Sequence, residues 1–139
     1  MLARLCSLRS AIPLRWDIRP APEPRWSTLK EMAHSFTATV DSDLAGIVTV
    51  TIGFAAPADN TRIVPDALAA IAALQLPGGR GIHFTGPASL PAAMALAHAV
   101  AHLYGYVACY DPKLQGFVVA ISHHPDFRPG QLLPPPAIP

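Results

Sequence analysis

Four of the six histidines form, with one aspartate and one lysine, the densest group of chemically capable residues in the chain. These histidines lie within 13 residues of Asp111, and they are His98, His102, His123 and His124. Imidazoles act as general acids or bases near neutral pH and bind metal ions. A carboxylate binds divalent cations, and the lysine ammonium binds phosphate as a point charge. In a chain with only 14% charged residues, this concentration indicates a functional site.

Two of the histidines have a spacing that helical metal sites use. His98 and His102 are four residues apart in a segment predicted to be helical, so we expect them to share one helix face. The pair alone is a weak signal. Packing or capping is the preferred interpretation of His98, and for His102, in the last turn, a favourable interaction with the helix C-terminal dipole is the alternative to a role in the site.

Asp111 lies between a predicted strand and Pro112, and its position has two interpretations. In one, it forms an Asx turn, in which its carboxylate accepts hydrogen bonds from backbone N–H groups of the loop. In the other, it binds a cation at a catalytic site. Lys113, two residues later, is either a solvated turn residue or a phosphate contact.

The elements that must position these residues begin with strands. Alternation of apolar and polar residues, and short runs rich in β-branched residues, predict strands at 35–41, 46–54, 82–85, 106–110 and 117–122. The first two strands are predicted to be joined by a hairpin loop at 41–46.

Two helices are predicted between the strands. The first covers 65–74, with Pro65 near its first turn and Asp66 placed favourably against the N-terminal dipole. The second runs from about 90 to 104, with Ser89 as its N-cap and Gly105 as its end. Six prolines from Pro125 onward predict no regular structure at the end of the chain.

The order ββαβαββ predicts a small single domain of the α/β (α+β) class, with two helices packed on a mixed sheet. The alternative is a small α+β sandwich without a parallel core. We expect a loose basic extension at 1–31, the domain at 32–124 and a proline-rich tail at 125–139. Met32 is an alternative natural start of the protein.

Charge, cysteine content and hydropathy limit the class of protein. Residues 32–139 carry four basic and six acidic side chains, which argues against sequence-independent binding of long nucleic acids. A small anion remains compatible with that balance. Cys6 and Cys109 make no disulfide framework, which favours a reducing cytoplasm, and Cys109 is expected in the core. No apolar run reaches the roughly 18 residues of a membrane span.

The glycine-rich loop at 78–81 is the nearest approach to a nucleotide-binding motif. It lies between a predicted helix and a strand, so it is interpreted first as a connecting turn, with an anion contact by Arg80 as a secondary role. No P-loop, G-x-G-x-x-G, G-x-S-x-G or C-x-x-C motif is present.

The predicted hairpin of the last two strands separates the candidate residues. Because Tyr110 is expected near Phe117 and Gly105 near Ser122, the turn and the two strand ends lie at opposite ends of the sheet. His102 and His123 then lie roughly 20 Å from Asp111 and Lys113, at about 3.3 Å per residue. We therefore expect either no shared site or an oligomer whose sites are built from two subunits.

The second half of the chain resembles the third family of CRISPR-associated ring nucleases, small accessory proteins of type III systems. The matching residues cover 81–87, the helix that ends near His102, the turn Tyr110-Asp111-Pro112-Lys113-Leu114 with the strand before it, the valine-rich strand at 116–122 ending in Ser-His, and Arg128-Pro129-Gly130. The resemblance is strong over about 50 residues. The predicted hairpin from His34 is compatible with it but generic.

This resemblance implies a manganese-dependent phosphodiesterase, with Mn²⁺ or another divalent cation, that opens cyclic tetra-adenylate and switches off the antiviral signal. It also implies deadenylation of RNA 3′ ends, homodimers that assemble head-to-tail into tetramers or filaments, and a prokaryotic cytoplasmic location. The implied catalytic residues are His102, Asp111, Lys113 and His123, with Asp111 and His123 at the metal. The residues expected to contact the ring are Gly86, Pro87, Ser122 and Arg80.

Two departures from the family pattern bear on the level of activity. The family usually has Arg in the turn where this chain has Lys113. A lysine ammonium contacts phosphate as a point charge, whereas an arginine guanidinium can donate two parallel hydrogen bonds. An aromatic residue of the family is replaced by Ala92 and Ala93. Two alternatives are a module that captures cyclic oligoadenylate without cutting it and a structural oligomerisation protein.

Overall fold

The structure is a computed structural model, and it describes residues 34–136. The predicted extension at 1–31, with Cys6, lies outside the described residues. Within them, six strands form one mixed sheet in the order β1-β2-β3-β4-β5-β6. The strands are β1 (Phe36–Leu44), β2 (Ile47–Phe54), β3 (Gly81–Thr85), β4 (Tyr106–Asp111), β5 (Gly116–Ser122) and β6 (Leu132–Leu133).

The centre of this sheet is parallel and its flanks are antiparallel. β2 pairs with β3, and β3 with β4, in parallel, whereas β1–β2, β4–β5 and β5–β6 are antiparallel pairs. The mixed sheet with two helices is confirmed, and the alternative without a parallel core is wrong.

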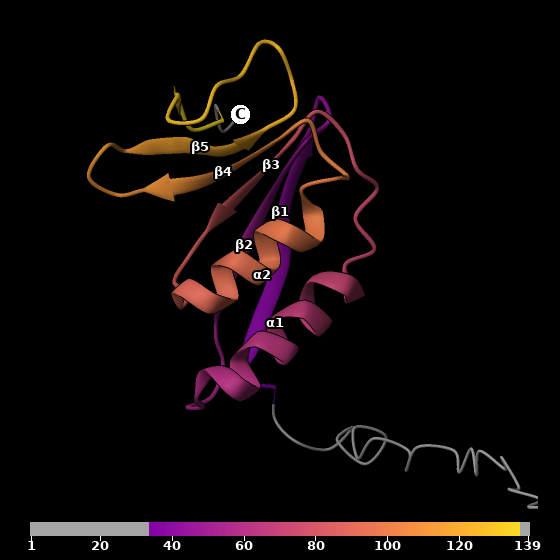
Figure 1. Ribbon diagram of the computed structural model, residues 1–139, viewed down its shortest axis with the longest axis vertical. Coiled ribbons are helices and arrows are strands. Elements are labelled where there is room, and N and C mark those ends of the chain that lie inside the picture. The colour runs from indigo at the N-terminus through magenta and orange to yellow at the C-terminus, as the bar shows by residue number, and fades with distance from the viewer. Residues whose placement is uncertain (1–33, 137–139) are drawn as a thin grey trace, which may run out of the picture. The chain divides into compact units, whose positions relative to one another are not determined.

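The two helices, α1 (Asn60–Ala73) and α2 (Leu90–Val100), lie on the same side of the sheet (Figure 1). Each forms the crossover between two parallel strands, and both crossovers move along the sheet in the same direction. Because such crossovers are right-handed, successive ones in one direction place their helices on one face. In residues 34–136 the other face has no helical layer.

Each face of the sheet has its own apolar core. The helices bury Ile63, Ala67 and Ile71 from α1 and Ala92, Leu96 and Val100 from α2 against inward-facing strand residues. On the helix-free face a smaller cluster comprises Tyr106, Ala108, Phe117 and Val119, with Phe127 and Leu133 of the C-terminal segment packed against it. The C-terminal segment therefore covers part of the face that lacks helices.

Helix α1 begins earlier than predicted. Asp59 is its N-cap and accepts a hydrogen bond from the Thr61 backbone N–H at 2.9 Å, so Pro65 lies inside the helix and not in its first turn. Asp66 consequently lies too far from the N-terminus to interact with the dipole. Its Oδ2 instead accepts hydrogen bonds from the backbone N–H and hydroxyl of Ser35, at 2.8 and 2.6 Å.

Two other predicted boundaries are wrong. The loop predicted at 41–46 is a two-residue turn at Ala45 and Gly46, both at positive φ, as in the I′ turns that suit hairpins. A bulge between Val40 and Ser42 allows β1 to continue through the polar segment to Leu44. The proline-rich end of the chain also contains regular structure, because β6 adds Leu132 and Leu133 to the free edge of β5.

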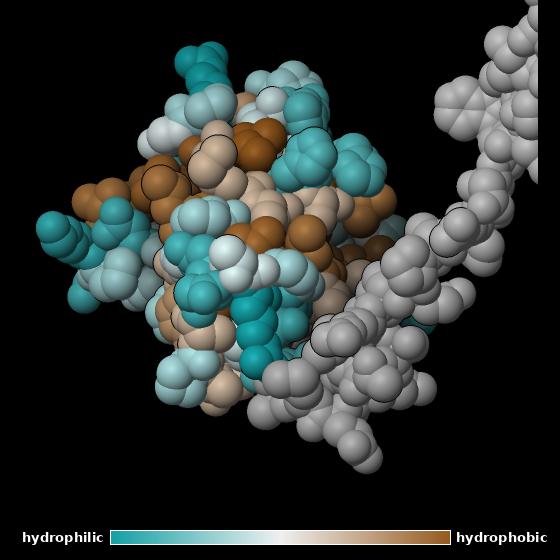
Figure 2. All heavy atoms as spheres, turned by 60° about the horizontal axis from the view of Figure 1, so that its bottom comes forward, coloured by the Kyte–Doolittle hydropathy of each residue, from teal (hydrophilic) through white to brown (hydrophobic). Residues whose placement is uncertain are grey.

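The surface mixes apolar and polar areas. Figure 2 shows one face, on which separate hydrophobic areas lie between hydrophilic ones. Leu90 and Met94 of α2 are 74% and 65% exposed, so the helix is apolar beyond its buried side. None of the helices in residues 34–136 has the length and apolar character needed to cross a bilayer.

Candidate functional site

The turn between β4 and β5 holds Asp111 and Lys113 together. Asp111 Oδ1 accepts hydrogen bonds from the backbone N–H groups of Lys113 at 2.8 Å and Leu114 at 3.2 Å. This is the Asx turn that was one interpretation of the sequence. Within the described residues no hydrogen bond engages Oδ2, and the Lys113 side chain is exposed. The turn therefore presents one carboxylate oxygen and one ammonium group to solvent.

His102 lies outside helix α2, contrary to the prediction. The helix ends at Val100 with Ala101 as its C-cap, and the Leu103 backbone N–H bonds the Val100 carbonyl at 2.9 Å in a tighter turn. Tyr104 then turns inward, where it is 3% exposed. His98 remains in the last helical turn, so the two exposed histidines are not a pair on one helix face.

His123 and the residues around it are held at the opposite end of the hairpin. The His123 backbone N–H donates to the Gly105 carbonyl at 2.7 Å, and its side chain is exposed. Ser122 Oγ lies 2.8 Å from the Phe127 carbonyl oxygen and accepts from the His124 backbone N–H at 3.2 Å. Ser122 therefore stabilises the loop that carries His123, and its contact with a ligand stays a prediction.

The register of β4 and β5 confirms that the candidate residues fall into two groups. Asp111 is opposite Gly116, whereas Tyr106 is opposite Ser122; a bulge between Val107 and Ala108 shifts the partner of Ser122 from the predicted Gly105 by one residue. The two ends of β4 are five residues apart, or roughly 17 Å at about 3.3 Å per residue. His102 and His123 lie at one end, and Asp111 and Lys113 at the other.

The predicted ligand contacts divide in the same way. Gly86 and Pro87 follow the carboxyl end of β3, on the side of the sheet where β4 ends at Asp111. Gly86 has φ +108°, and a Cβ there would lie 2.0 Å from the Ile52 carbonyl oxygen, so backbone packing alone requires glycine. Arg80 precedes β3 and lies at the end that holds His123.

A metal ion cannot be held by the predicted pair within one subunit. Asp111 and His123 lie at opposite ends of the hairpin, and residues 34–136 contain no group of three or more His, Cys, Asp or Glu side chains placed to hold an ion. Asp111 offers its free Oδ2 as one hard oxygen ligand. Within residues 34–136 it belongs to no group of three such ligands.

Cys109 is exposed, which makes the expectation of a core cysteine wrong. By alternation along β4 it is on the same side as Val107, which packs under the helices. Figure 1 shows that the β4–β5 hairpin extends beyond the helical layer. The strand therefore leaves the core before it ends.

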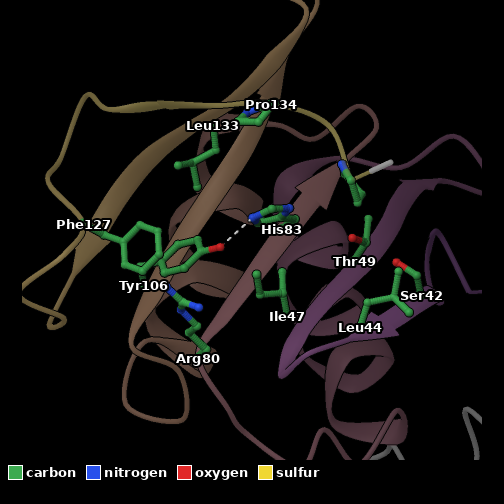
Figure 3. A pocket seen from close by; sticks show the side chains of 11 residues that line it. Ser42, Leu44, Ile47, Thr49, Arg80, His83, Tyr106, Phe127, Leu133 and Pro134 are labelled. Atoms are coloured by element: carbon green, nitrogen blue, oxygen red, sulfur yellow. Dashed lines mark hydrogen bonds between the residues drawn. The ribbon is translucent and has the colours of Figure 1, made fainter. Parts of the chain in front are cut away.

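A cavity that sequence reasoning missed lies on the helix-free face of the sheet (Figure 3). Its central polar residue is His83, which is 4% exposed and stacks on Phe117 with ring centroids 4.3 Å apart. His83 Nε2 lies 2.9 Å from the Tyr106 hydroxyl. Burial lowers the pKa of His83 from 6.5 to about 4, so the ring is neutral at physiological pH. Burial also raises the pKa of Tyr106, although nearby Arg80 opposes this effect.

The only sequence signal for this cavity was a histidine in an otherwise apolar strand, at 82–85. A buried histidine in a strand is more often a satisfied core residue than a site residue. The cavity itself depends on residues from β1, β2, β4 and the C-terminal segment, which are distant in sequence.

Comparison with known proteins identifies a family that the chain matches. A sequence model of the family described as CRISPR-associated protein (Cas_csx3) matches residues 57–134. The matched segment contains both helices, β3 to β6 and all eight predicted site residues. No curated protein matches the chain significantly.

Proposed function

Because the chain belongs to the family of CRISPR-associated proteins described as Cas_csx3, we propose that it is a ring nuclease. In this proposal it opens cyclic tetra-adenylate by phosphodiester cleavage in a prokaryotic cytoplasm, and so ends type III antiviral signalling. The family match supports the CRISPR association, and the resemblance of the turn at 110–114 and of the Ser-His strand end supports the activity. Deadenylation of RNA 3′ ends is a second reaction of the same site.

The observation that carries the proposal is the separation of the two groups along β4–β5. Asp111 and Lys113 cannot meet His102 and His123 of the same subunit across roughly 17 Å. A head-to-tail arrangement, as the resemblance implies, brings the turn of one subunit to the histidine end of another. Each complete site then combines Asp111 and Lys113 of one subunit with His102 and His123 of another.

The residue types suit cleavage of a phosphodiester. His102 or His123 acts as general base on a ribose 2′-hydroxyl or a water, or as general acid to the leaving oxygen. Lys113 neutralises charge that develops on the phosphoryl oxygens. Asp111, with His123 of another subunit, holds Mn²⁺ or another divalent cation, whose chemistry there is charge stabilisation at the scissile phosphate. Arg80, Ser122 and the Gly86–Pro87 segment position the ring.

The test is incubation of the full chain with cyclic tetra-adenylate, with Mn²⁺ and with a chelator. We expect linear product in the presence of Mn²⁺ only, and loss of product in the Asp111→Ala variant. A polyadenylated RNA in parallel reactions tests the second reaction. Product formation that is unchanged by the chelator would contradict the metal requirement, and an intact ring in every reaction would contradict the activity.

The second candidate is a module that binds the ring without cutting it. Two features favour it: Lys113 replaces the usual Arg of the turn, and Asp111 Oδ1 is already engaged by the turn. Tight binding of an intact ring, measured by calorimetry in the same Mn²⁺ buffer, would support this candidate over the nuclease. A purely structural oligomerisation protein would show neither binding nor cleavage.

A further inference from the structure

The cavity on the helix-free face has a volume of about 320 Å³, which is within the range of small-molecule sites. Leu44 and Ile47 of the β1–β2 hairpin form one wall, and Phe127 and Leu133 of the C-terminal segment form another (Figure 3). A largely apolar space of this size accepts a flat ring. It lies on the opposite side of the sheet from α1 and α2.

His83 supplies a polar group inside this space. Its Nε2 is bonded to Tyr106, and Figure 3 shows the second ring nitrogen directed away from Tyr106, on the side of Thr49. Within residues 34–136 this nitrogen, Nδ1, has no hydrogen-bond partner although His83 is only 4% exposed. Buried polar atoms are nearly always paired, so an unpaired one in a residue that lines a cavity points to a ligand or a water.

Arg80 supplies a positive charge at the edge of the same space. Its guanidinium lies 5.2 Å from the centroid of the Phe127 ring, and no ion pair engages it among the described residues. Arg80 and His83 are three positions apart, or roughly 10 Å along an extended chain. That separation suits a ligand with a polar ring atom at one end and an acidic group at the other.

We propose that this cavity binds a planar aromatic or heteroaromatic ring that carries one anionic group. The ring lies between the apolar walls and makes one hydrogen bond to His83 Nδ1, and the anionic group binds Arg80. A mononucleotide and a free aromatic carboxylic acid share this chemistry. The site shares Arg80 with the ring contacts proposed above but is separate from the Asp111–Lys113 turn, and binding here does not require that the protein cleave phosphodiesters.

Calorimetric titration of the full chain with adenosine 5′-monophosphate and, separately, with indole-3-acetate tests the proposal and distinguishes the two sources. We expect saturable binding of at least one probe. Removal of the acid, with adenosine or indole as the probe, should weaken that binding by about ten-fold or more, as expected for the loss of one charged hydrogen bond. Inorganic phosphate alone should not compete.

Variants connect the binding to the cavity. His83→Phe keeps the stacked ring but removes both nitrogens, and Arg80→Met removes the charge; each should weaken binding by about ten-fold or more. Ser42→Trp should block the cavity without altering His83. Arg128→Met is the matched control, since Arg128 is exposed and does not line the cavity, and it should leave binding unchanged.

Thermal melting separates loss of fold from loss of binding. Binding that is abolished in Ser42→Trp, with a melting temperature near that of the wild type, supports the proposal even where His83→Phe fails to fold. Absence of saturable binding of both probes would overturn it. So would binding that folded Arg80→Met and Ser42→Trp proteins retain at full strength.

Discussion

His83 connects the protonation state of one residue to the stability of the whole domain. Burial lowers its pKa in the folded state from 6.5 to about 4, so between these values the unfolded chain binds a proton that the folded protein does not. The free energy of unfolding contributed by His83 therefore decreases as pH falls from about 6.5 to 4. The full effect is on the order of 3 kcal/mol.

We predict that His83→Phe removes most of this pH dependence. The replacement has no titrating group and retains the stacking on Phe117, whereas the wild type should lose stability on acidification. Urea denaturation at pH 7.5, 6, 5 and 4.5 measures the effect. His98→Gln is the control, because His98 is exposed and its loss should leave the dependence nearly unchanged. Equal pH dependence in wild type and His83→Phe would contradict the prediction.

Lys113 determines how strongly the turn holds a phosphate, if the proposed nuclease activity is correct. Lys113→Ala should lower kcat/KM for cyclic tetra-adenylate by about 10²-fold or more, because a charge that stabilises the transition state is lost. Lys113→Arg should equal or exceed the wild type, since a guanidinium contacts phosphate with two parallel donors. Steady-state kinetics of the three proteins provides the measurement, and an Arg variant as weak as the Ala variant would refute this role.

At the scale of elements, Ser35 and Asp66 connect the start of β1 to helix α1. Ser35 is 1% exposed, and both its hydroxyl and its backbone N–H donate to Asp66 Oδ2. These bonds hold the pKa of Asp66 below its ordinary value against the opposing effect of burial, with help from Arg62. The contact fixes the position of the helix over the sheet at the end where β1 begins.

We predict that Ser35→Ala lowers the free energy of unfolding by about 1.5 to 3 kcal/mol, the range for a hydrogen bond to a charged group. Thr37→Val is a suitable control, because Thr37 is an exposed strand residue whose hydroxyl makes one long bond of 3.4 Å to Gly53. It should change stability by no more than about 0.5 kcal/mol. Equal effects of the two substitutions in urea denaturation would show that the Ser35 contact contributes nothing specific.

At the scale of the whole molecule, the proposal that each site is shared between two subunits makes a prediction about mixtures. His102→Ala and Asp111→Ala proteins should each be inactive on cyclic tetra-adenylate. In a mixture, a shared site is intact when its turn comes from the His102→Ala protein and its histidines come from the Asp111→Ala protein. After equal mixing and subunit exchange, about one quarter of the sites should therefore be wild type, because each site draws its two halves independently.

The matched control is a mixture of His102→Ala with His123→Ala. Both substitutions damage the same half-site, so no pairing of subunits restores it, and activity should remain absent. Recovery in the first mixture and not in the second would support sites shared between subunits. Failure of the first mixture to recover, with subunit exchange verified by mass spectrometry, would contradict them.

Local patterns in the sequence were sufficient to predict most elements. Alternation and β-branched runs identified the five long strands, and Ser89 marked the start of α2. The errors arose where tertiary contacts override local preference. Pro65 is accommodated inside α1, and α2 ends about one turn early, before the buried Tyr104. β6 forms despite the prolines on either side of it, because β5 offers it an edge.

The sequence by itself determined which residue types with acid–base or ligand chemistry lie on the β4–β5 hairpin. It also determined the separation of the two ends of the hairpin, because strand length and turn position set that distance directly. The tertiary structure alone determined the surroundings of His83. Its burial, its unpaired Nδ1 and the cavity around it depend on segments from residue 42 to residue 136 that meet only in the folded sheet. Local spacing in the sequence does not predict which distant side chains pack over a strand. That packing determines both the pKa of His83 and the shape of the cavity that it lines.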